Sequence, residues 1–129
     1  MLERTNVEGL SEPPGYSHAV VASGRRLVTT AGAVPLNPEG NLVGPGDYVT
    51  QAKQGLENLA LTLGAVGAQD GDVLKTTIYV ASQNSEDLTA VWRVVQESEV
   101  ANAASTLLGV SLLGYEGQLV EIEAIAVLE

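Results

Sequence analysis

Cysteine is absent from this chain, so disulfide bonds, thiolate nucleophiles and cysteine metal sites are all excluded. Histidine occurs once, at His18, directly after Ser17. On an extended segment the side chains of two neighbouring residues point in opposite directions, so this serine and this histidine cannot act as a nucleophile and its base. A serine-type hydrolytic triad and a zinc site are both disfavoured, because a lone histidine lacks the clustered partners that each requires.

Basic residues are also scarce. The chain has 6 lysines and arginines against 16 aspartates and glutamates, a formal net charge of −10. Nucleic acids and anionic membrane surfaces both bind concentrated positive patches, so neither is expected as a partner. No apolar run approaches the roughly 20 residues that cross a bilayer, and the first residues contain no apolar stretch of signal-peptide length. These absences predict a cytoplasmic location.

The apolar content that is present suffices for one core. Hydrophobic residues make up 45% of the 129 positions, which predicts a single domain over residues 1–129. Residues 19–22 and 27–30 are apolar and β-branched, and with a turn at Gly24 between them they predict a β-hairpin. Prolines, glycines and asparagines dominate residues 35–46, which we interpret as a loop.

Two stretches show the three- and four-residue spacing of apolar side chains that is typical of an amphipathic helix. The first spans residues 47–66, and the second begins at Asn84 or Ser85. Three further segments have the composition of strands: residues 73–81, 105–112 and 119–128. The last two of these are expected to pair with each other across a turn at residues 114–117.

The predicted order of elements is β-β-α-β-α-β-β, which indicates an α+β fold with a five- to six-stranded mixed sheet. Two amphipathic helices can cover one face of such a sheet. The other face would leave many apolar strand side chains in water, so we expect self-association to cover it.

The final strand has the most informative pattern. Its even positions, from Val120 to Leu128, are uniformly apolar, whereas its odd positions place Glu121 and Glu123 side by side. Either these glutamates face water, or they line a cleft in which a carboxylate does chemistry.

Five strings of residues, in order along the chain, resemble segments of the RidA family, which is also called the YjgF or UK114 family and has the older name L-PSP endoribonuclease. They are residues 14–20 (PGYSHAV), 30–35 (TAGAVP), 51–59 (QAKQGLENL), 72–80 (DVLKTTIYV) and 121–126 (EIEAIA). The resemblance implies a fold similar to that of chorismate mutase. It also implies a homotrimer in which a cleft at each subunit interface binds a small organic molecule.

Well-studied members of that family hydrolyse reactive imines and enamines, such as 2-iminobutyrate, to ketones and ammonia. They need no metal or organic cofactor, so the resemblance implies none here. In the family an arginine binds the substrate carboxylate, a tyrosine helps to shape the pocket, and a glutamate positions the attacking water. By position, Tyr16 matches the tyrosine and Glu121 matches the glutamate, which makes Glu121 the candidate catalytic residue.

The family's arginine is missing from this chain. Ser105 stands at its position, and Trp92 stands where many members carry an asparagine. Losing a charged pair in a partly desolvated cleft costs about 3–4 kcal/mol, roughly a hundred- to a thousandfold in affinity, whereas a serine donates one neutral hydrogen bond worth about 1 kcal/mol. We therefore expect a ligand without the usual carboxylate, in a pocket that Trp92 makes more apolar. Gly32, at a strand end, indicates a close approach of the backbone, either to a ligand or in a turn.

Each assignment has a structural alternative. Glu121 can be a solvated or inter-subunit glutamate, Glu123 its structural partner, Tyr16 an interface residue, Trp92 a core residue and Ser105 an ordinary strand serine. Three functions therefore stay open: a divergent imine or enamine hydrolase, a non-catalytic metabolite-binding or regulatory trimer, and a ribonuclease. The last is disfavoured by the net charge of −10 and by the lack of a second histidine.

Overall fold

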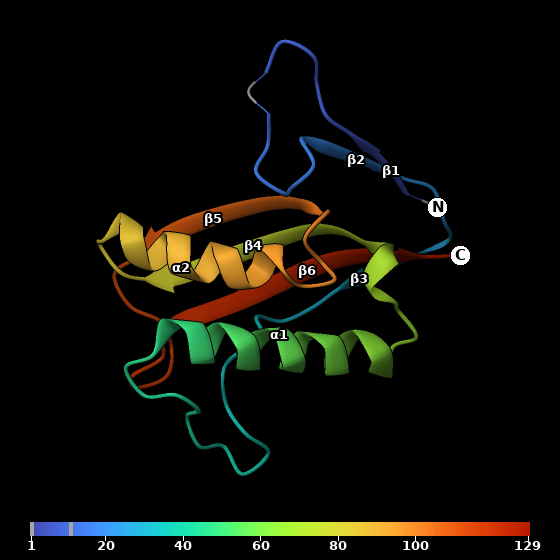
Figure 1. Cartoon of the computed structure of the whole chain (residues 1–129). Coiled ribbons are helices and arrows are strands. Elements are labelled where there is room, and N and C mark those ends of the chain that lie inside the picture. The colour runs from blue at the N-terminus through green and yellow to red at the C-terminus, as the bar shows by residue number, and fades with distance from the viewer. Residues whose placement is uncertain (1, 11) are drawn as a thin grey trace.

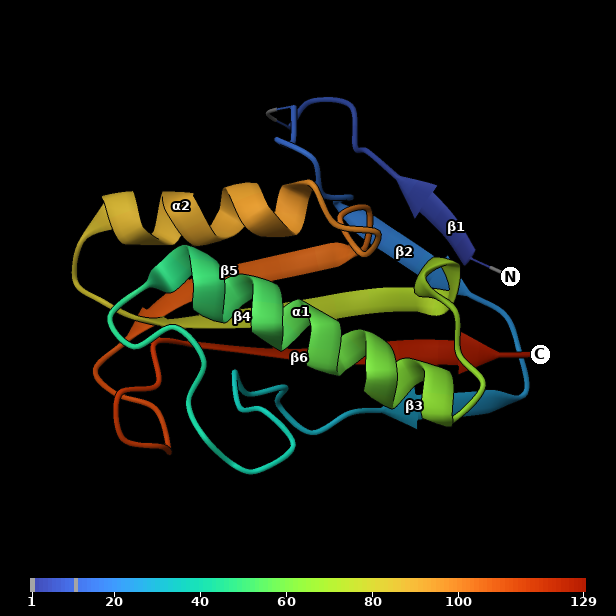
Figure 2. The same cartoon turned by 60° about the horizontal axis from the view of Figure 1, so that its bottom comes forward.

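The computed structural model describes residues 2–10 and 12–129. Two helices, α1 (Tyr48–Ala65) and α2 (Ser85–Gln96), lie on one face of a four-stranded mixed sheet with the order β3-β6-β4-β5 (Figures 1 and 2). The strands of this sheet are β3 (Arg26–Thr29), β4 (Val73–Ala81), β5 (Ala104–Val110) and β6 (Val120–Leu128). A separate antiparallel pair, β1 (Leu2–Thr5) and β2 (Ala19–Ala22), lies beside the start of β5 (Figure 1). The predicted α+β fold with two helices on one face of a mixed sheet is confirmed, although its strands are divided between two sheets.

The predicted hairpin of residues 19–22 and 27–30 is wrong. Both segments form strands, but β2 pairs with β1, and β3 pairs with β6. The reason lies at Gly24, where a Cβ atom would collide with the side chain of Val127 and with the backbone of Leu128. The link between β2 and β3 is therefore packed against the end of β6. The sequence pattern does not predict β1, because its four residues, LERT, show no apolar alternation.

The predicted pairing of the two closing strands is also wrong. Strand β5 lies at the edge of the sheet, parallel to β4, whereas β6 lies between β3 and β4 and runs antiparallel to both. The connection at residues 111–119 therefore passes the end of β4, where Ala81 donates its backbone N–H to the Leu119 carbonyl at 2.9 Å. An inner position suits β6, because its even face is dry and both of its backbone edges find a partner.

Both helices begin where the sequence predicts. Asp47 caps α1: its Oδ1 accepts the backbone N–H of Thr50 at 3.1 Å, and its Oδ2 accepts the Thr50 hydroxyl at 2.7 Å. These hydrogen bonds, the backbone one first, hold the pKa of Asp47 below its usual value. Helix α2 follows Asn84, whose side chain makes no capping hydrogen bond.

The even positions of β6 face the helices and are buried, which confirms the predicted dry face. They pack in one core with residues of α1 and β4 such as Leu59, Leu63 and Ile78. The odd positions, Glu121 and Glu123 among them, point to the opposite face and are half-buried. Within the described residues, no helix is long and apolar enough to cross a membrane.

We call the sheet face away from the two helices the open face. By strand register it carries Leu27 and Thr29 of β3, Glu121, Glu123, Ile125 and Val127 of β6, Lys75, Thr77 and Tyr79 of β4, and Ala104, Thr106, Leu108 and Val110 of β5. Its apolar members are half-buried or exposed, and Leu27 is 69% exposed. The open face is therefore the uncovered apolar surface that the sequence predicts.

Candidate functional site

Three of the predicted binding residues meet in one pocket. Tyr16 precedes β2, Trp92 lies on α2 and Ser105 lies on β5, and together with Pro14 and Leu107 they line a pocket of about 300 Å³. We call this the aromatic pocket. It lies on the helix side of β5, because Ser105 pairs with Thr76, a residue whose side chain is fully buried under the helices.

The aromatic rings and the N-terminal segment hold one another in place. The rings of Tyr16 and Trp92 meet edge to face, with centroids 6.0 Å apart and planes at 71°. The indole N–H of Trp92 donates to the Pro14 carbonyl at 3.0 Å, which ties residues 12–16 to α2. The rings of His18 and Tyr16 also meet edge to face, with centroids 6.0 Å apart, and His18 Nδ1 accepts the backbone N–H of Val7 at 2.9 Å. The lone histidine is thus a structural neighbour of the pocket wall.

Ser105 has no proton left for a ligand. Its hydroxyl lies 2.6 Å from the Thr76 hydroxyl and 3.3 Å from the Ala103 carbonyl oxygen. A carbonyl oxygen can only accept, so Ser105 is the donor in the second contact. A hydroxyl carries a single proton, so Ser105 offers a ligand only a lone pair. The Trp92 N–H is likewise committed to Pro14. Within the described chain the hydroxyl of Tyr16 makes no hydrogen bond, so it is the polar group of this wall that a ligand can use.

Glu121 lies on the open face, between a glycine and an amide. Gln118, which is 3% exposed, donates its Nε2–H to Glu121 Oε1 at 3.0 Å. A Cβ atom at Gly32 would collide with Glu121 Oε2. Gly32 is not among the glycines with positive φ, so this position requires glycine for space and not for backbone conformation. We call Gly32, Gln118 and Glu121 the carboxylate site.

Glu123 has a partner of its own. The hydroxyl of Tyr79 donates to Glu123 Oε1, and this hydrogen bond is the main reason that the pKa of Tyr79 lies above its usual value. Burial and the charges of Glu123 and Glu121 act in the same direction. Glu123 therefore fits the structural partner role, whereas Oε2 of Glu121 has no donor among the described residues.

The aromatic pocket and the carboxylate site lie on opposite faces of the sheet. Strand β4 shows this directly: Thr76, which pairs with Ser105, faces the helices, while Tyr79, which pairs with Glu121, faces the other way. One chain therefore cannot place Ser105 and Glu121 in the same cavity. Sequence reasoning missed Gln118 and Thr76, because no local pattern marks a residue whose role depends on a neighbouring strand or turn.

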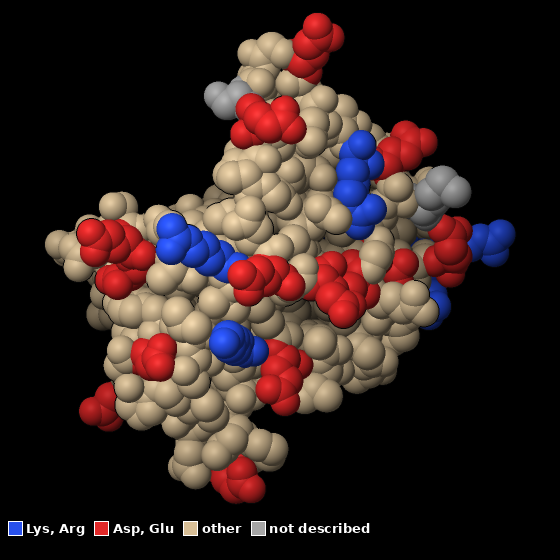
Figure 3. Space-filling model, in the orientation of Figure 1, with Lys and Arg blue, Asp and Glu red and all other residues tan. Residues whose placement is uncertain are grey.

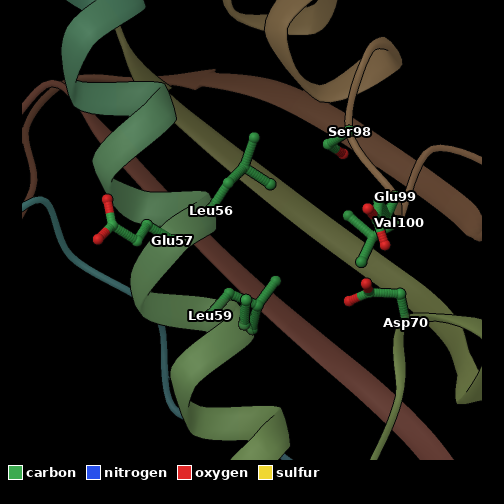
Figure 4. A pocket seen from close by; sticks show the side chains of 8 residues that line it. Leu56, Glu57, Leu59, Asp70, Ser98, Glu99 and Val100 are labelled. Carbon is green, nitrogen blue, oxygen red and sulfur yellow. The ribbon is translucent and has the colours of Figure 1, made fainter.

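Two further pockets are present, one away from these residues and one that shares Gln118 with the carboxylate site. One, of about 330 Å³, has Leu56, Leu59 and Val100 as apolar walls and the carboxyl groups of Asp70 and Glu99 at its rim (Figure 4). The hydrogen bond between these two carboxyl groups, followed by their mutual repulsion, raises the pKa of Glu99. The other pocket, of about 470 Å³, is enclosed mainly by residues 111–119 and includes Gln118. Across the described residues, no three histidine, cysteine, aspartate or glutamate side chains are grouped so that they could hold a metal ion.

Comparison with known proteins gives a consistent picture. Residues 10–128 match the model of the family described as Endoribonuclease L-PSP. A mouse protein named 2-iminobutanoate/2-iminopropanoate deaminase is 36% identical over 114 residues, which cover 87% of this chain and 80% of the mouse protein. A RutC family protein of Pyrococcus horikoshii is 34% identical, with 98% of each chain covered.

Solved structures agree with these relatives. A Yersinia pestis protein of unknown function from the conserved Rid family, YyfB, superposes with a TM-score of 0.89 at 34% identity, covering 98% of each chain. The structure of Escherichia coli TdcF with bound serine superposes with a TM-score of 0.69 at 27% identity, covering 98% of this chain and 94% of TdcF. The similarity therefore extends over the whole sheet and both helices.

Proposed function

We propose that this chain, which belongs to the Endoribonuclease L-PSP family (also called RidA or YjgF), binds a small uncharged organic molecule between the protomers of a homotrimer and hydrolyses an imine or enamine there. Glu121 positions the attacking water. One observation carries the proposal: the aromatic pocket and the carboxylate site are on opposite faces of one sheet. Only a second copy can bring an aromatic pocket up to a carboxylate site.

The open face supports association of copies. It combines exposed or half-buried apolar side chains, such as Leu27, Leu108 and Ile125, with the carboxylate site itself. An uncovered sheet face of this kind usually marks an interface between subunits. A protomer that lays the edge of β5 against its neighbour's open face brings its Ser105 side close to the neighbour's Glu121.

The aromatic pocket favours a neutral ligand. None of the described residues that line it is charged, and the donor groups of Ser105 and Trp92 are already used within the chain. A carboxylate placed there would lose its hydration without gaining a cationic partner, which costs several kcal/mol. The mouse relative is named for 2-iminobutanoate and 2-iminopropanoate, which both carry a carboxylate. This chain is suited to a related imine in which that group is absent or neutral.

The carboxylate site supplies a base for water. As the water oxygen bonds to the carbon of a protonated imine, the C=N π electrons move to nitrogen and the water proton passes to Glu121. Glu121 then returns that proton to nitrogen. As the C–N bond breaks, the hydroxyl proton of the intermediate passes to the departing ammonia, which leaves a carbonyl compound and ammonium. Atoms and charge balance with one imine and one water consumed, so no further reactant is required.

Two substrates that differ only in charge test the binding preference. We expect faster ammonia release from 2-iminobutanamide than from 2-iminobutanoate, by about tenfold or more in kcat/KM, since the carboxylate finds no cation. Glu121→Gln should lower turnover by about a hundredfold or more, whereas Glu123→Gln, the matched control on the same strand, should keep most of it. A clear preference for 2-iminobutanoate would overturn the neutral-ligand proposal.

Mixed trimers test whether the cleft is shared between copies. Glu121→Gln destroys the carboxylate site and Tyr16→Ala the aromatic pocket, so each variant alone should be nearly inactive. When the two are unfolded and refolded together, about one quarter of the clefts should combine two intact parts, because each part is drawn at random. Recovery of roughly that share of activity supports a shared cleft. A mixture that stays as inactive as its components would contradict it.

A non-catalytic binding protein is the second candidate, and the internally satisfied hydroxyl of Ser105 favours it, since it leaves the pocket with little chemistry of its own. Trp92, the chain's single tryptophan, reports binding through its fluorescence. A change in that fluorescence with 2-iminobutanamide, without ammonia release above the uncatalysed rate, would select this candidate.

Ribonuclease activity, which the family description names, is not supported by the charge distribution. The net charge is −10, and on the face shown in Figure 3 acidic side chains are spread widely while basic ones are few and separated. A polyanionic RNA strand would meet repulsion there.

A further inference from the structure

Gln118 is a buried amide whose hydrogen bonds are all assigned. It lies in the turn before β6 and is 3% exposed. Its Oε1 accepts the backbone N–H of Tyr115 at 3.1 Å, and its Nε2 donates to the Val120 carbonyl at 3.1 Å and to Glu121 Oε1 at 3.0 Å. Both amide protons and the amide oxygen therefore have partners.

These partners fix the orientation of the amide. The N–H of Tyr115 can only donate, and the Val120 carbonyl can only accept. A flipped amide would place an oxygen against the Val120 carbonyl and an NH₂ group against the Tyr115 N–H, so both contacts would become repulsive. The group that faces Glu121 is thus an N–H donor, set by backbone atoms and not by Glu121 itself.

The two oxygens of Glu121 are made different by this contact. Oε1 is held as an acceptor by Gln118, and Oε2 lies beside Gly32, where the missing Cβ leaves the room that it occupies. We propose that Gln118 is a positioning residue that fixes Glu121 through Oε1 and so makes Oε2, at Gly32, the oxygen that takes the proton from water. This proposal rests on the proposed function for its catalytic consequence. It also links the 111–119 segment to the carboxylate, since the amide is anchored on Tyr115.

Gln51 is a matched control. It is also a fully buried glutamine with three hydrogen bonds, two of them to the 111–119 segment: Nε2 donates to the carbonyls of Gly44 and Gly117, both at 3.1 Å, and Oε1 accepts the N–H of Leu119 at 2.7 Å. Unlike Gln118, its amide forms no hydrogen bond with Glu121. If activity is lost only because a buried amide and its turn are disturbed, substitution of either glutamine should therefore lower activity to the same extent.

The kinetic test compares Gln118→Met, Gln118→Glu and Gln51→Met by ammonia release from 2-iminobutanamide. Gln118→Met keeps the approximate side-chain shape but removes the N–H donor. We expect kcat to fall about ten- to a hundredfold while KM changes less than about threefold. The reason is that the Glu121 carboxylate loses its alignment with water, whereas the groups that bind the substrate are unchanged. Gln118→Glu should be worse, since it places a second carboxylate against Glu121. Gln51→Met should lower the melting temperature at least as much while keeping kcat near that of the wild type. Equal losses of kcat at both glutamines would overturn the proposal.

A spectroscopic test is independent of turnover. In ¹⁵N-labelled protein, the side-chain amide signals of Gln118 should shift in Glu121→Ala and stay in place in Glu123→Ala, whereas the Gln51 amide signals should be unaffected by either change. If the Gln118 signals do not shift in Glu121→Ala, the hydrogen bond between Gln118 and Glu121 is absent and the proposal is wrong. If the signals behave as expected but the wild type releases no ammonia, the contact stands and the proposed hydrolysis fails.

Discussion

The aromatic pocket and the carboxylate site use their polar atoms in opposite ways. In the aromatic pocket the Ser105 hydroxyl and the Trp92 N–H are committed to bonds within the chain, so the wall that remains is mostly apolar. In the carboxylate site a buried amide holds one oxygen of Glu121 and leaves the other beside Gly32. The aromatic pocket encloses space for a ligand but offers few free polar groups. The carboxylate site has a carboxylate oxygen that can accept a proton from water, but it lies on the open face and not in the aromatic pocket. Because the two regions lie on opposite faces of the sheet, the proposed function requires that the aromatic pocket of one copy meets the carboxylate site of another.

Removing the space at Gly32 should have the largest effect on the carboxylate site. In Gly32→Ala the new methyl group collides with the flexible end of Glu121, which can rotate away, so the fold should survive while the carboxylate leaves its place. We expect kcat for 2-iminobutanamide to fall about a hundredfold, with ligand-induced Trp92 fluorescence changed little. Gly114→Ala is the control, because a Cβ there meets no atom within 4 Å. Similar kinetics for the two alanine variants would show that the position of Glu121 is unimportant.

Adding a cation to the aromatic pocket should reverse the expected preference for a neutral ligand. Ser105→Arg introduces a bidentate donor at the wall formed by Tyr16, Trp92 and Leu107, so 2-iminobutanoate should gain about tenfold or more in kcat/KM relative to 2-iminobutanamide. Thr89→Arg adds the same charge on an exposed part of α2 and should leave the ratio unchanged. A ratio that moves equally in both variants would mean that net charge, and not the pocket, decides the preference.

The smallest expected effect lies outside both regions, at the Asp70–Glu99 pair. The pKa of Glu99 is higher in the folded state than in the unfolded chain, so the folded state binds the Glu99 proton more tightly. The free energy of unfolding therefore falls as pH rises from the ordinary carboxyl range through the raised pKa. Glu99→Gln removes the repulsion, so the melting temperature should rise slightly at about pH 7 and be nearly unchanged at about pH 3. Glu57→Gln, in the same pocket, is the control. Ammonia release should be unaffected, and a change in it would link this pocket to the site.

Local patterns predicted the elements better than their partners. Helix α1, strand β4 and the dry face of β6 follow from apolar spacing and capping residues such as Asp47, all of which act within a few positions along the chain. The pairing of β3 with β6 and of β5 with β4 depends on segments far apart in sequence, and adjacent strands were wrongly expected to pair.

The same difference applies to the candidate site: its residues could be named from the sequence, but their hydrogen-bond partners could not. The resemblance identified Tyr16, Trp92, Ser105 and Glu121, and the strand-end position identified Gly32. The structure brings three of these residues into the aromatic pocket and the other two into contact beside Gln118. The resemblance could not foresee that the Ser105 hydroxyl is already hydrogen-bonded to the Ala103 carbonyl and to the Thr76 hydroxyl, because partners across strands depend on register. For the same reason it missed Gln118.

By itself the sequence determined the α+β class, the two helices, the alternation that puts Glu121 on the face opposite the core, and the lack of a cation at position 105. Periodicity and residue chemistry are local, so they can be read along one chain. Three features could not be read in this way: which strands are neighbours, which face each site residue occupies, and which atoms remain available to a ligand. These features depend on strand register and on close packing between distant segments. As a result, Ser105 and Glu121 lie on opposite faces of a single sheet.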